Sequence, residues 1–381
     1  MGGAMAFHRH FVERDDFELF VASDDPAILR PETPYRSVFF RQPAWLDRMC
    51  RTRLSLWAHS YKHLVAGRFV PREVMAEARR FHPDLVLTIA GSWNWTALMA
   101  RHLARRLGVP LAGSFNDWFD YSIFIHPLLH ARLERKFRAF YRSCDLALCT
   151  CEGMREELGP HPNAYVLYPL GAPLPPQVPA ASTRREAGST FVAVFAGNLG
   201  NWYGPMLEQL VQASRSAGAP VEFRFYGSNP SWSREFDRVA RAQGIFRGQV
   251  PFAQLRHEAA NADGLLLLMG FGDACAQIER TSFKTKFLDY VSIQKPILLW
   301  GPAYCSAMRY AREFDSAECC TSAQPEDFLR TITRLAAEKG RQGELVAHAH
   351  RMSRDRFNPE TIHRGLVEQF HKLVAGHSNE R

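Results

Sequence analysis

Four polar residues in the second half of the chain have a spacing that could do chemistry. They are Ser282, Thr285, Lys286 and Asp289, at i, i+3, i+4 and i+7, which a helix would place on one face. We expect Ser282 to cap this helix, which would run to about Val291. Seven residues rise ~10 Å along a helix. That length suits a diphosphate at the helix start and a ribose diol near Asp289, since a carboxylate can accept two hydroxyl donors. The alternative is a solvated helix face.

A glycine-rich turn is a second candidate binding element. The stretch FAGNLGNWYG at 195–204 follows an apolar run and precedes a helical pattern, with Gly197 and Asn198 at the turn. A turn of this kind exposes backbone N–H groups and lets an anion approach closely. The alternative is a tight turn such as any α/β protein contains.

Short apolar runs alternate with longer amphipathic stretches along the chain, and these elements must position the polar residues. The apolar runs are continuous, which is typical of parallel strands covered on both faces. The expected strands are 17–22, 84–90, 145–150, 190–196, 221–226, 263–269 and 296–300. The expected helices are 96–107, 128–142, 205–217, 233–243, 283–291 and a final one at 358–375. This alternation predicts an α/β, doubly wound fold.

The length of the chain and a proline-rich stretch predict two domains. The chain has 381 residues, and about 150 residues is an ordinary domain. The stretch YPLGAPLPPQVP at 168–179 holds five prolines in twelve residues and reads as a linker. We expect one domain at 1–170, a linker at 171–188 and a second domain at 189–357.

The apolar patterning argues against a membrane-spanning or secreted protein, and the charge balance indicates the kind of partner. The 47 basic residues exceed the 39 acidic ones, giving a net charge of +8, which favours anionic partners. No apolar run reaches the ~20 residues of a membrane helix, and the N-terminus lacks an apolar signal-peptide core. We therefore expect a cytoplasmic protein. The eight cysteines form no CxxC pair, so neither a zinc site nor a disulfide framework is predicted.

The chain resembles the retaining family-4 glycosyltransferases, whose fold is called GT-B. The resemblance rests on ordered stretches: FAGNLGNWYG, VEFRFYGSNP, FRGQVPFAQLRHEAANADGLLLLM and SFKTKFLDYVSIQKPILLWGP in the second half, and GVPLAGSFNDWFD, CDLALCTCEGMREELG and the closing RFNPETIHRGLVEQF more loosely. It implies two Rossmann-like domains that face a cleft, with the helix at 358–375 joining the first domain. The first strand of that N-terminal domain is missing from the sequence pattern.

The resemblance also implies roles for residues of the second half. Asp289 matches the acidic residue that holds the donor ribose. The family's other acidic residue would be Thr281 here, so Glu279 is the candidate to face the donor sugar. Asn198 stands where the family has Arg and Tyr203 where it has Lys, so Lys286, Lys284 or Arg280 would have to neutralise the diphosphate. The other candidate donor-binding residues are Ser282, Thr285 and Gly197.

In the first half, Asn116 and Asp117 occupy the place of a His-Asp run and are the candidate catalytic residues with Glu279. Gly2 and Gly3 resemble the glycine loop where acceptor and phosphates meet. The implied activity is transfer of a sugar from a nucleotide-sugar donor to a glycan or glycolipid acceptor, in envelope or exopolysaccharide synthesis. The family works with retention of configuration and without a metal or other cofactor.

Two alternatives to a transferase remain open at this point. One is a nucleotide-sugar epimerase of the same fold, and the other is a catalytically inactive binding or scaffold protein. No nucleic-acid partner is expected, since no motif supports one. The basic amphipathic stretch at 128–142 suggests peripheral contact with an anionic membrane on its cytoplasmic face, or else a surface helix packed on its own sheet.

Overall fold

The computed structural model describes residues 2–25, 34–91, 93, 95–118, 125–175 and 190–379. They form two compact units. The first unit comprises 1–169, 281–283 and 360–381, and the second unit comprises 170–280 and 284–359. The predicted linker at 171–188 is described only as far as residue 175, and the rest of it lies outside the described residues. Among the helices of the described part, none is long and apolar enough to cross a membrane.

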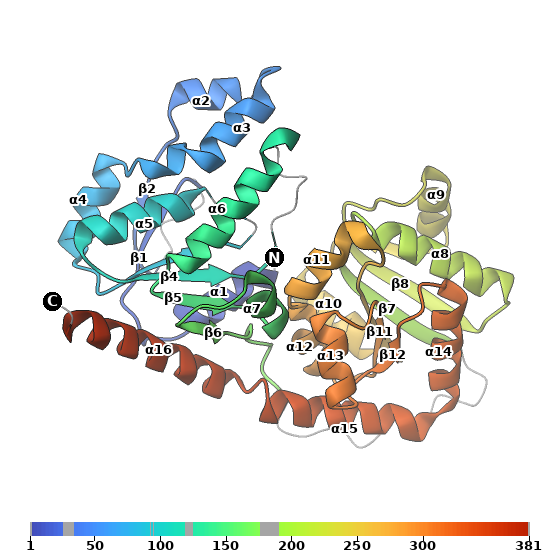
Figure 1. The fold of residues 1–381 in the computed structure, drawn as a ribbon. Coiled ribbons are helices and arrows are strands. Elements are labelled where there is room, and N and C mark those ends of the chain that lie inside the picture. The colour runs from blue at the N-terminus through green and yellow to red at the C-terminus, as the bar shows by residue number, and fades with distance from the viewer. Residues whose placement is uncertain are drawn as a thin grey trace. The chain divides into compact units, whose positions relative to one another are not determined.

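The first unit is built on a parallel four-stranded sheet in the order β3-β4-β5-β6 (Figure 1). These strands are β3 (Val86–Ile89), β4 (Leu111–Phe115), β5 (Leu146–Cys149) and β6 (Ala164–Val166). Strands β1 (Phe20–Ser23) and β2 (Arg36–Phe39) form a separate parallel pair. The carboxyl ends of β3 and β4 lead into Gly91 and Asn116, so the predicted catalytic residues follow directly from a buried strand.

Helices cover this sheet and tie the end of the chain to it. They are α1 (Gly2–Phe11), α2 (Ala44–Met49), α3 (Ser55–Leu64), η2 (Ala66–Arg68), α4 (Arg72–Phe81), α5 (Thr96–Leu107), η3 (Pro127–Leu129), α6 (His130–Arg142), α7 (Glu152–Leu158) and α16 (Pro359–Asn379). Helix α16 is held by a two-pronged ion pair between Arg14 and Glu360, at 2.8 and 2.7 Å, and by His363 Nε2 at 2.9 Å from Asp16 Oδ2. The predicted closing helix therefore packs within the first unit.

Helix α6 shows which face of the basic stretch at 128–142 is buried. Its apolar residues Leu133, Phe137 and Phe140 are each at most 1% exposed. Phe137 lies edge-on to Phe115 of β4, with ring centroids 5.5 Å apart. The apolar face of α6 thus packs on its own sheet, and it is not free to lie on a membrane.

The second unit has a six-stranded parallel sheet in the order β12-β11-β10-β7-β8-β9. Its strands are β7 (Phe191–Asn198), β8 (Val221–Ser228), β9 (Phe246–Gly248), β10 (Gly264–Leu268), β11 (Ile297–Trp300) and β12 (Glu318–Cys320). The chain runs outward from β7 through β8 to β9 and then returns to β10 on the other side of β7. The point where the strand order reverses therefore lies between β7 and β10, and ligands of open α/β sheets bind outside the carboxyl ends of the strands at that point.

Eight helices are described in the second unit. They are α8 (Tyr203–Ser216), α9 (Arg234–Ala242), α10 (Phe252–Ala260), α11 (Asp273–Thr281), α12 (Thr285–Val291), α13 (Ser306–Glu313), α14 (Pro325–Ala337) and α15 (Lys339–Asp355). Leu207 and Leu210 of α8 share a buried core with Phe195 of β7 and Phe328 of α14. This core fixes the strand ends that carry the candidate site.

The structure corrects one detail of the predicted polar helix. Helix α12 begins at Thr285, and its N-cap position is Lys284, which makes no side-chain cap. The prediction that Ser282 caps this helix is wrong, because the Ser282 hydroxyl makes a tertiary hydrogen bond that the sequence pattern does not reveal. Thr285, Lys286 and Asp289 remain on α12, within the spacing of one helix face.

Candidate active site

The carboxyl end of β7 meets α12 at Gly197. The Lys286 ammonium donates to the carbonyl oxygen of Ala196 at 3.0 Å. A Cβ on Gly197 would lie 2.0 Å from Lys286 Nζ, and the φ of Gly197 is +149°. Only glycine lets the lysine reach the strand end in this way. The structure therefore brings two predicted donor-binding residues, Gly197 and Lys286, into direct contact at the switch point of the sheet.

Lys286 is a cation with little solvent around it. Burial, with the charge of Lys284 nearby, lowers the pKa of Lys286 to about 8. Its ammonium lies 4.7 Å from the centroid of the Phe195 ring. Burial disfavours the protonated form of Lys286, and an anion bound at the end of β7 would stabilise that form. This lysine is therefore suited to bind a phosphate group.

Helix α12 is fixed to β7 by a second contact. The backbone N–H of Ala196 donates to the Tyr290 hydroxyl oxygen at 3.1 Å, and burial raises the pKa of this phenol. Tyr290 is 4% exposed. The sequence analysis did not single out Tyr290, although it lies one residue after Asp289 in the stretch that carries the resemblance.

A buried carboxylate organises the residues behind Lys286. Glu279 is 0% exposed, and its Oε1 accepts from Trp202 Nε1 at 2.9 Å and from the backbone N–H of Gly270 at 3.0 Å. Its Oε2 forms an ion pair with Lys284 Nζ at 2.7 Å. Lys284 also donates to the Tyr203 hydroxyl at 3.1 Å. Glu279 thus joins the ends of β10 and α11 to the turn after β7.

The electrostatics of this network keep Lys284 charged. Burial alone would lower the pKa of Lys284, but Tyr203 and Glu279 outweigh burial and raise it. Lys284 was one of the three cations expected at the diphosphate, whereas Trp202 and Tyr203 were not predicted as site residues. The signal for these two aromatic residues was present in the turn sequence LGNWYG.

Asp289 lies on α12 and is half-buried. Its Oδ1 accepts from the backbone N–H of Ala172 at 3.0 Å. The neighbouring Gly171 packs so closely on the same helix that a Cβ there would lie 2.7 Å from the Cβ of Leu288. Asp289 therefore fixes the segment after residue 169 against α12. Thr285 is the first residue of the same helix. Asn198 is the last residue of β7, and its Oδ1 accepts from the N–H of Gly200 at 3.1 Å.

The remaining predicted residues lie in the first unit. Asp117 is exposed, and its Oδ1 accepts from the Ser282 hydroxyl at 2.7 Å. Asn116 Oδ1 accepts from the Ser114 hydroxyl at 2.9 Å. A Cβ on Gly91 would lie 2.8 Å from the backbone nitrogen of Asn116, so the ends of β3 and β4 are in close contact. Ser282, predicted on the donor side, is thus grouped with the candidate catalytic residues.

Gly2 and Gly3 were predicted in a loop, and the structure places both in helix α1. Their helical backbone does not form the turn that the resemblance implies for them.

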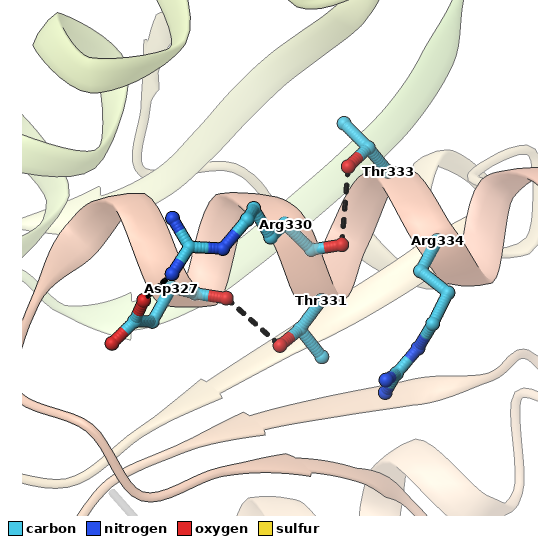
Figure 2. Close-up of a pocket in the computed structure, with 5 residues that line it drawn as sticks. All are labelled: Asp327, Arg330, Thr331, Thr333 and Arg334. Carbon is cyan, nitrogen blue, oxygen red and sulfur yellow. Dashed lines mark hydrogen bonds and ion pairs between the residues drawn. The ribbon is translucent and has the colours of Figure 1, made fainter.

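A surface hollow lies elsewhere in the second unit. It measures about 640 Å³ and runs along α14, lined by Asp327, Arg330, Thr331, Thr333 and Arg334 (Figure 2). The hydroxyls of Thr331 and Thr333 donate to carbonyls of their own helix at 2.9 and 3.1 Å, and Arg330 is paired with Asp327. With these groups engaged along one open helix face, the hollow is a poor candidate for a nucleotide site.

Metal-binding side chains do not gather in the described ranges. No group of three or more His, Cys, Asp or Glu residues there could hold a metal ion. The expectation of a reaction without a metal stays a prediction.

Comparison with protein families gives one match. Residues 4–164 match the family described as Glycosyltransferase Family 4, which is less than half of the 381 residues. No curated protein matches the chain.

Solved structures share the fold over most of the chain. HepE of Anabaena in complex with UDP is 13% identical, with a TM-score of 0.63, covering 97% of this chain and 95% of HepE. A glycosyltransferase from Rickettsia africae is 10% identical, with a TM-score of 0.67, covering 98% and 95%. TarM is 9% identical, with a TM-score of 0.55, covering 78% of this chain and 57% of TarM. This chain thus spans little more than half the length of TarM.

These findings confirm the GT-B fold with its two Rossmann-like units. The family match and the shared fold together support a glycosyltransferase enzyme.

Proposed function

We propose that the chain transfers a sugar from a nucleotide-sugar donor to an acceptor hydroxyl, because residues 4–164 match the model of Glycosyltransferase Family 4 and the chain has a GT-B fold. The observation that carries the proposal is the contact of Lys286 with the end of β7 at Gly197. It sets a desolvated cation at the switch point of the second sheet. A departing diphosphate needs a positive charge there, and a preorganised cation stabilises the charge as it develops.

Each unit has its own part in this proposal. The second unit binds the donor, with Lys286 at the diphosphate and Asp289 at the ribose. Glu279 acts through Lys284 and the Gly270 amide as a positioning residue. The first unit binds the acceptor beside Asp117 and Asn116. That the HepE structure holds UDP supports a nucleotide donor of this kind.

The proposed reaction retains the configuration at the anomeric carbon and uses no metal. The bond between that carbon and the diphosphate oxygen breaks, and the acceptor oxygen bonds to the same face of the sugar. The acceptor proton passes to the departing diphosphate. The acceptor is a glycan or glycolipid of the cell envelope or of an exopolysaccharide, reached at the inner face of the membrane.

Turnover assays distinguish this reaction from the two alternatives. The purified protein is incubated with UDP-, GDP- and dTDP-sugars, with and without lipid-linked acceptors, and nucleoside diphosphate release is measured. Acceptor-dependent release supports the transferase. Change of the sugar without an acceptor would identify an epimerase, and tight nucleotide binding with no turnover would identify a binding protein.

A further inference from the structure

The first unit carries large apolar side chains on a surface that its own core does not cover. Trp45 on α2 is 46% exposed, Trp57 on α3 is 49% exposed, and Leu128 in η3 is 81% exposed. The rings of Trp45 and Tyr61 lie 5.6 Å apart, and Trp57 stacks on His126 at 4.2 Å. These contacts join α2, α3 and η3 into one aromatic patch. It consists of Trp45, Trp57, Tyr61, His126 and Leu128.

The segment that carries most of the aromatic patch is rich in basic residues. Between residues 41 and 63 there are five Arg or Lys and a single acidic residue, Asp47. Asp47 is paired with Arg51 at 3.2 Å. Arg48 and Arg53 are exposed on the same segment. This excess of positive charge next to exposed tryptophan is complementary to an anionic surface that has an apolar interior.

A second group of cations borders the same helices. It consists of Arg68, Arg101, Arg132 and Lys136, from η2, α5 and α6. Lys136 donates to the carbonyl of Leu64, the last residue of α3, at 2.7 Å. Burial, followed by the charges of Arg68, Arg101 and Arg132, lowers the pKa of Lys136. No carboxylate contributes to that shift, so these cations repel one another.

We infer that the aromatic patch and the cations around it dock the first unit on an anionic phospholipid membrane. The tryptophans enter the headgroup boundary, and the arginines and lysines contact lipid phosphates. This inference rests on the proposed function, because docking on a membrane would bring the acceptor side of the enzyme to a lipid-linked substrate. It also moves the predicted membrane contact from the buried apolar face of α6 to α2, α3 and η3; α2, α3 and α6 are labelled in Figure 1.

Vesicle binding tests this inference without any nucleotide sugar. The full chain is sedimented with phosphatidylcholine vesicles that contain or lack phosphatidylglycerol. We expect binding to the anionic vesicles only, weakened by salt. Trp45→Ala with Trp57→Ala should lower the partition coefficient at least ~tenfold, because two apolar side chains are lost from the boundary. The matched control is Phe252→Ala with Arg256→Glu on α10, where Phe252 is 59% exposed; it should bind as wild type.

Fluorescence quenching by brominated lipid checks which tryptophans enter the bilayer. Quenching should occur in the wild type and disappear in Trp45→Phe with Trp57→Phe, a variant that keeps its apolar contacts. Wild-type binding by the alanine variant, or no binding to anionic vesicles, would overturn the inference. A concentration-dependent dimer of the wild type that the double-alanine variant abolishes would also overturn it, since the patch would then bind a second copy of the chain. Nucleotide binding by the soluble protein is measured separately, so failure here leaves the proposed function standing.

Discussion

Gly197 shows how a single residue determines whether the candidate donor site can form. Its Cβ-free backbone leaves room for the Lys286 ammonium, which occupies the space a side chain would need. The positive φ adds a second reason for glycine, since other residues are strained there.

Replacement of Gly197 should therefore weaken nucleotide binding. We expect Gly197→Ala to displace Lys286 and lower the affinity for a nucleoside diphosphate at least tenfold, about 1.4 kcal/mol. Isothermal titration calorimetry measures this directly. Gly343→Ala is the matched control, because nothing lies within 4 Å of a Cβ at this position in α15. Equal affinities of Gly197→Ala and wild type would show that Lys286 does not contact the ligand.

The lowered pKa of Lys286 predicts a pH dependence of binding. The ammonium is protonated below about pH 8 and loses its charge as the pH rises through that value. A diphosphate is fully ionised before then, so its affinity should fall between about pH 7 and 9. Lys286→Arg keeps its charge throughout this range and should bind with little pH dependence. A wild-type affinity that does not change with pH would separate Lys286 from the phosphate.

Among the elements, α12 is important because it carries the predicted donor contacts to the end of β7. Tyr290 fixes this helix by accepting from the buried N–H of Ala196. Tyr290→Phe leaves that donor without its partner and should cost about 1–3 kcal/mol of unfolding free energy. Urea denaturation measures the loss. Tyr61→Phe, at a hydroxyl on the exposed face of α3, should leave stability unchanged, and a Tyr290→Phe curve that coincides with it would refute the anchoring role.

Sequence patterns predicted the long elements well and the short ones poorly. The helix at 96–107 matches α5 at both ends, and all seven predicted strands overlap an observed one. Strands β2, β6, β9 and β12 were missed because they are short and lack the continuous apolar run that marks the equally short β3, β5 and β11. Strand β4, LAGSF, was missed because glycine and serine interrupt its apolar run.

Local spacing could not predict contacts between distant residues. The pairing of Ser282 with Asp117 joins residues 165 positions apart, so a pattern read along one helix assigned Ser282 to the wrong neighbours. The ion pair of Glu279 with Lys284 is local in the chain, but its burial depends on the distant Trp202 and Tyr203, which hydrogen-bond to it. The glycine turn and the lysine were predictable because their residue types constrain the backbone and the charge directly.

At the level of the molecule, the last helix of the chain completes the first unit. Phe370 of α16 is 3% exposed, with its ring 5.5 Å from Phe17 and 6.4 Å from Phe11. Phe370→Ala should destabilise the first unit by about 3–5 kcal/mol, since a large buried ring is lost. Differential scanning calorimetry should show the transition of that unit at a lower temperature. Phe252→Ala, in an exposed position of the second unit, should change neither transition. An unshifted first transition in Phe370→Ala would mean that α16 contributes little to that unit.

The central claim, a nucleotide-sugar site on the second unit, is tested most directly by thermal shift. Wild type, Asp289→Ala and Asp289→Asn are melted with UDP, GDP, dTDP, CDP and ADP. The asparagine variant keeps an acceptor for the Ala172 N–H, so it separates loss of the ligand from loss of this contact. A nucleotide at about 100 times its Kd should stabilise wild type by about 2.7 kcal/mol and stabilise both variants far less. If no nucleotide stabilises wild type, or if the variants respond as wild type does, the account is contradicted.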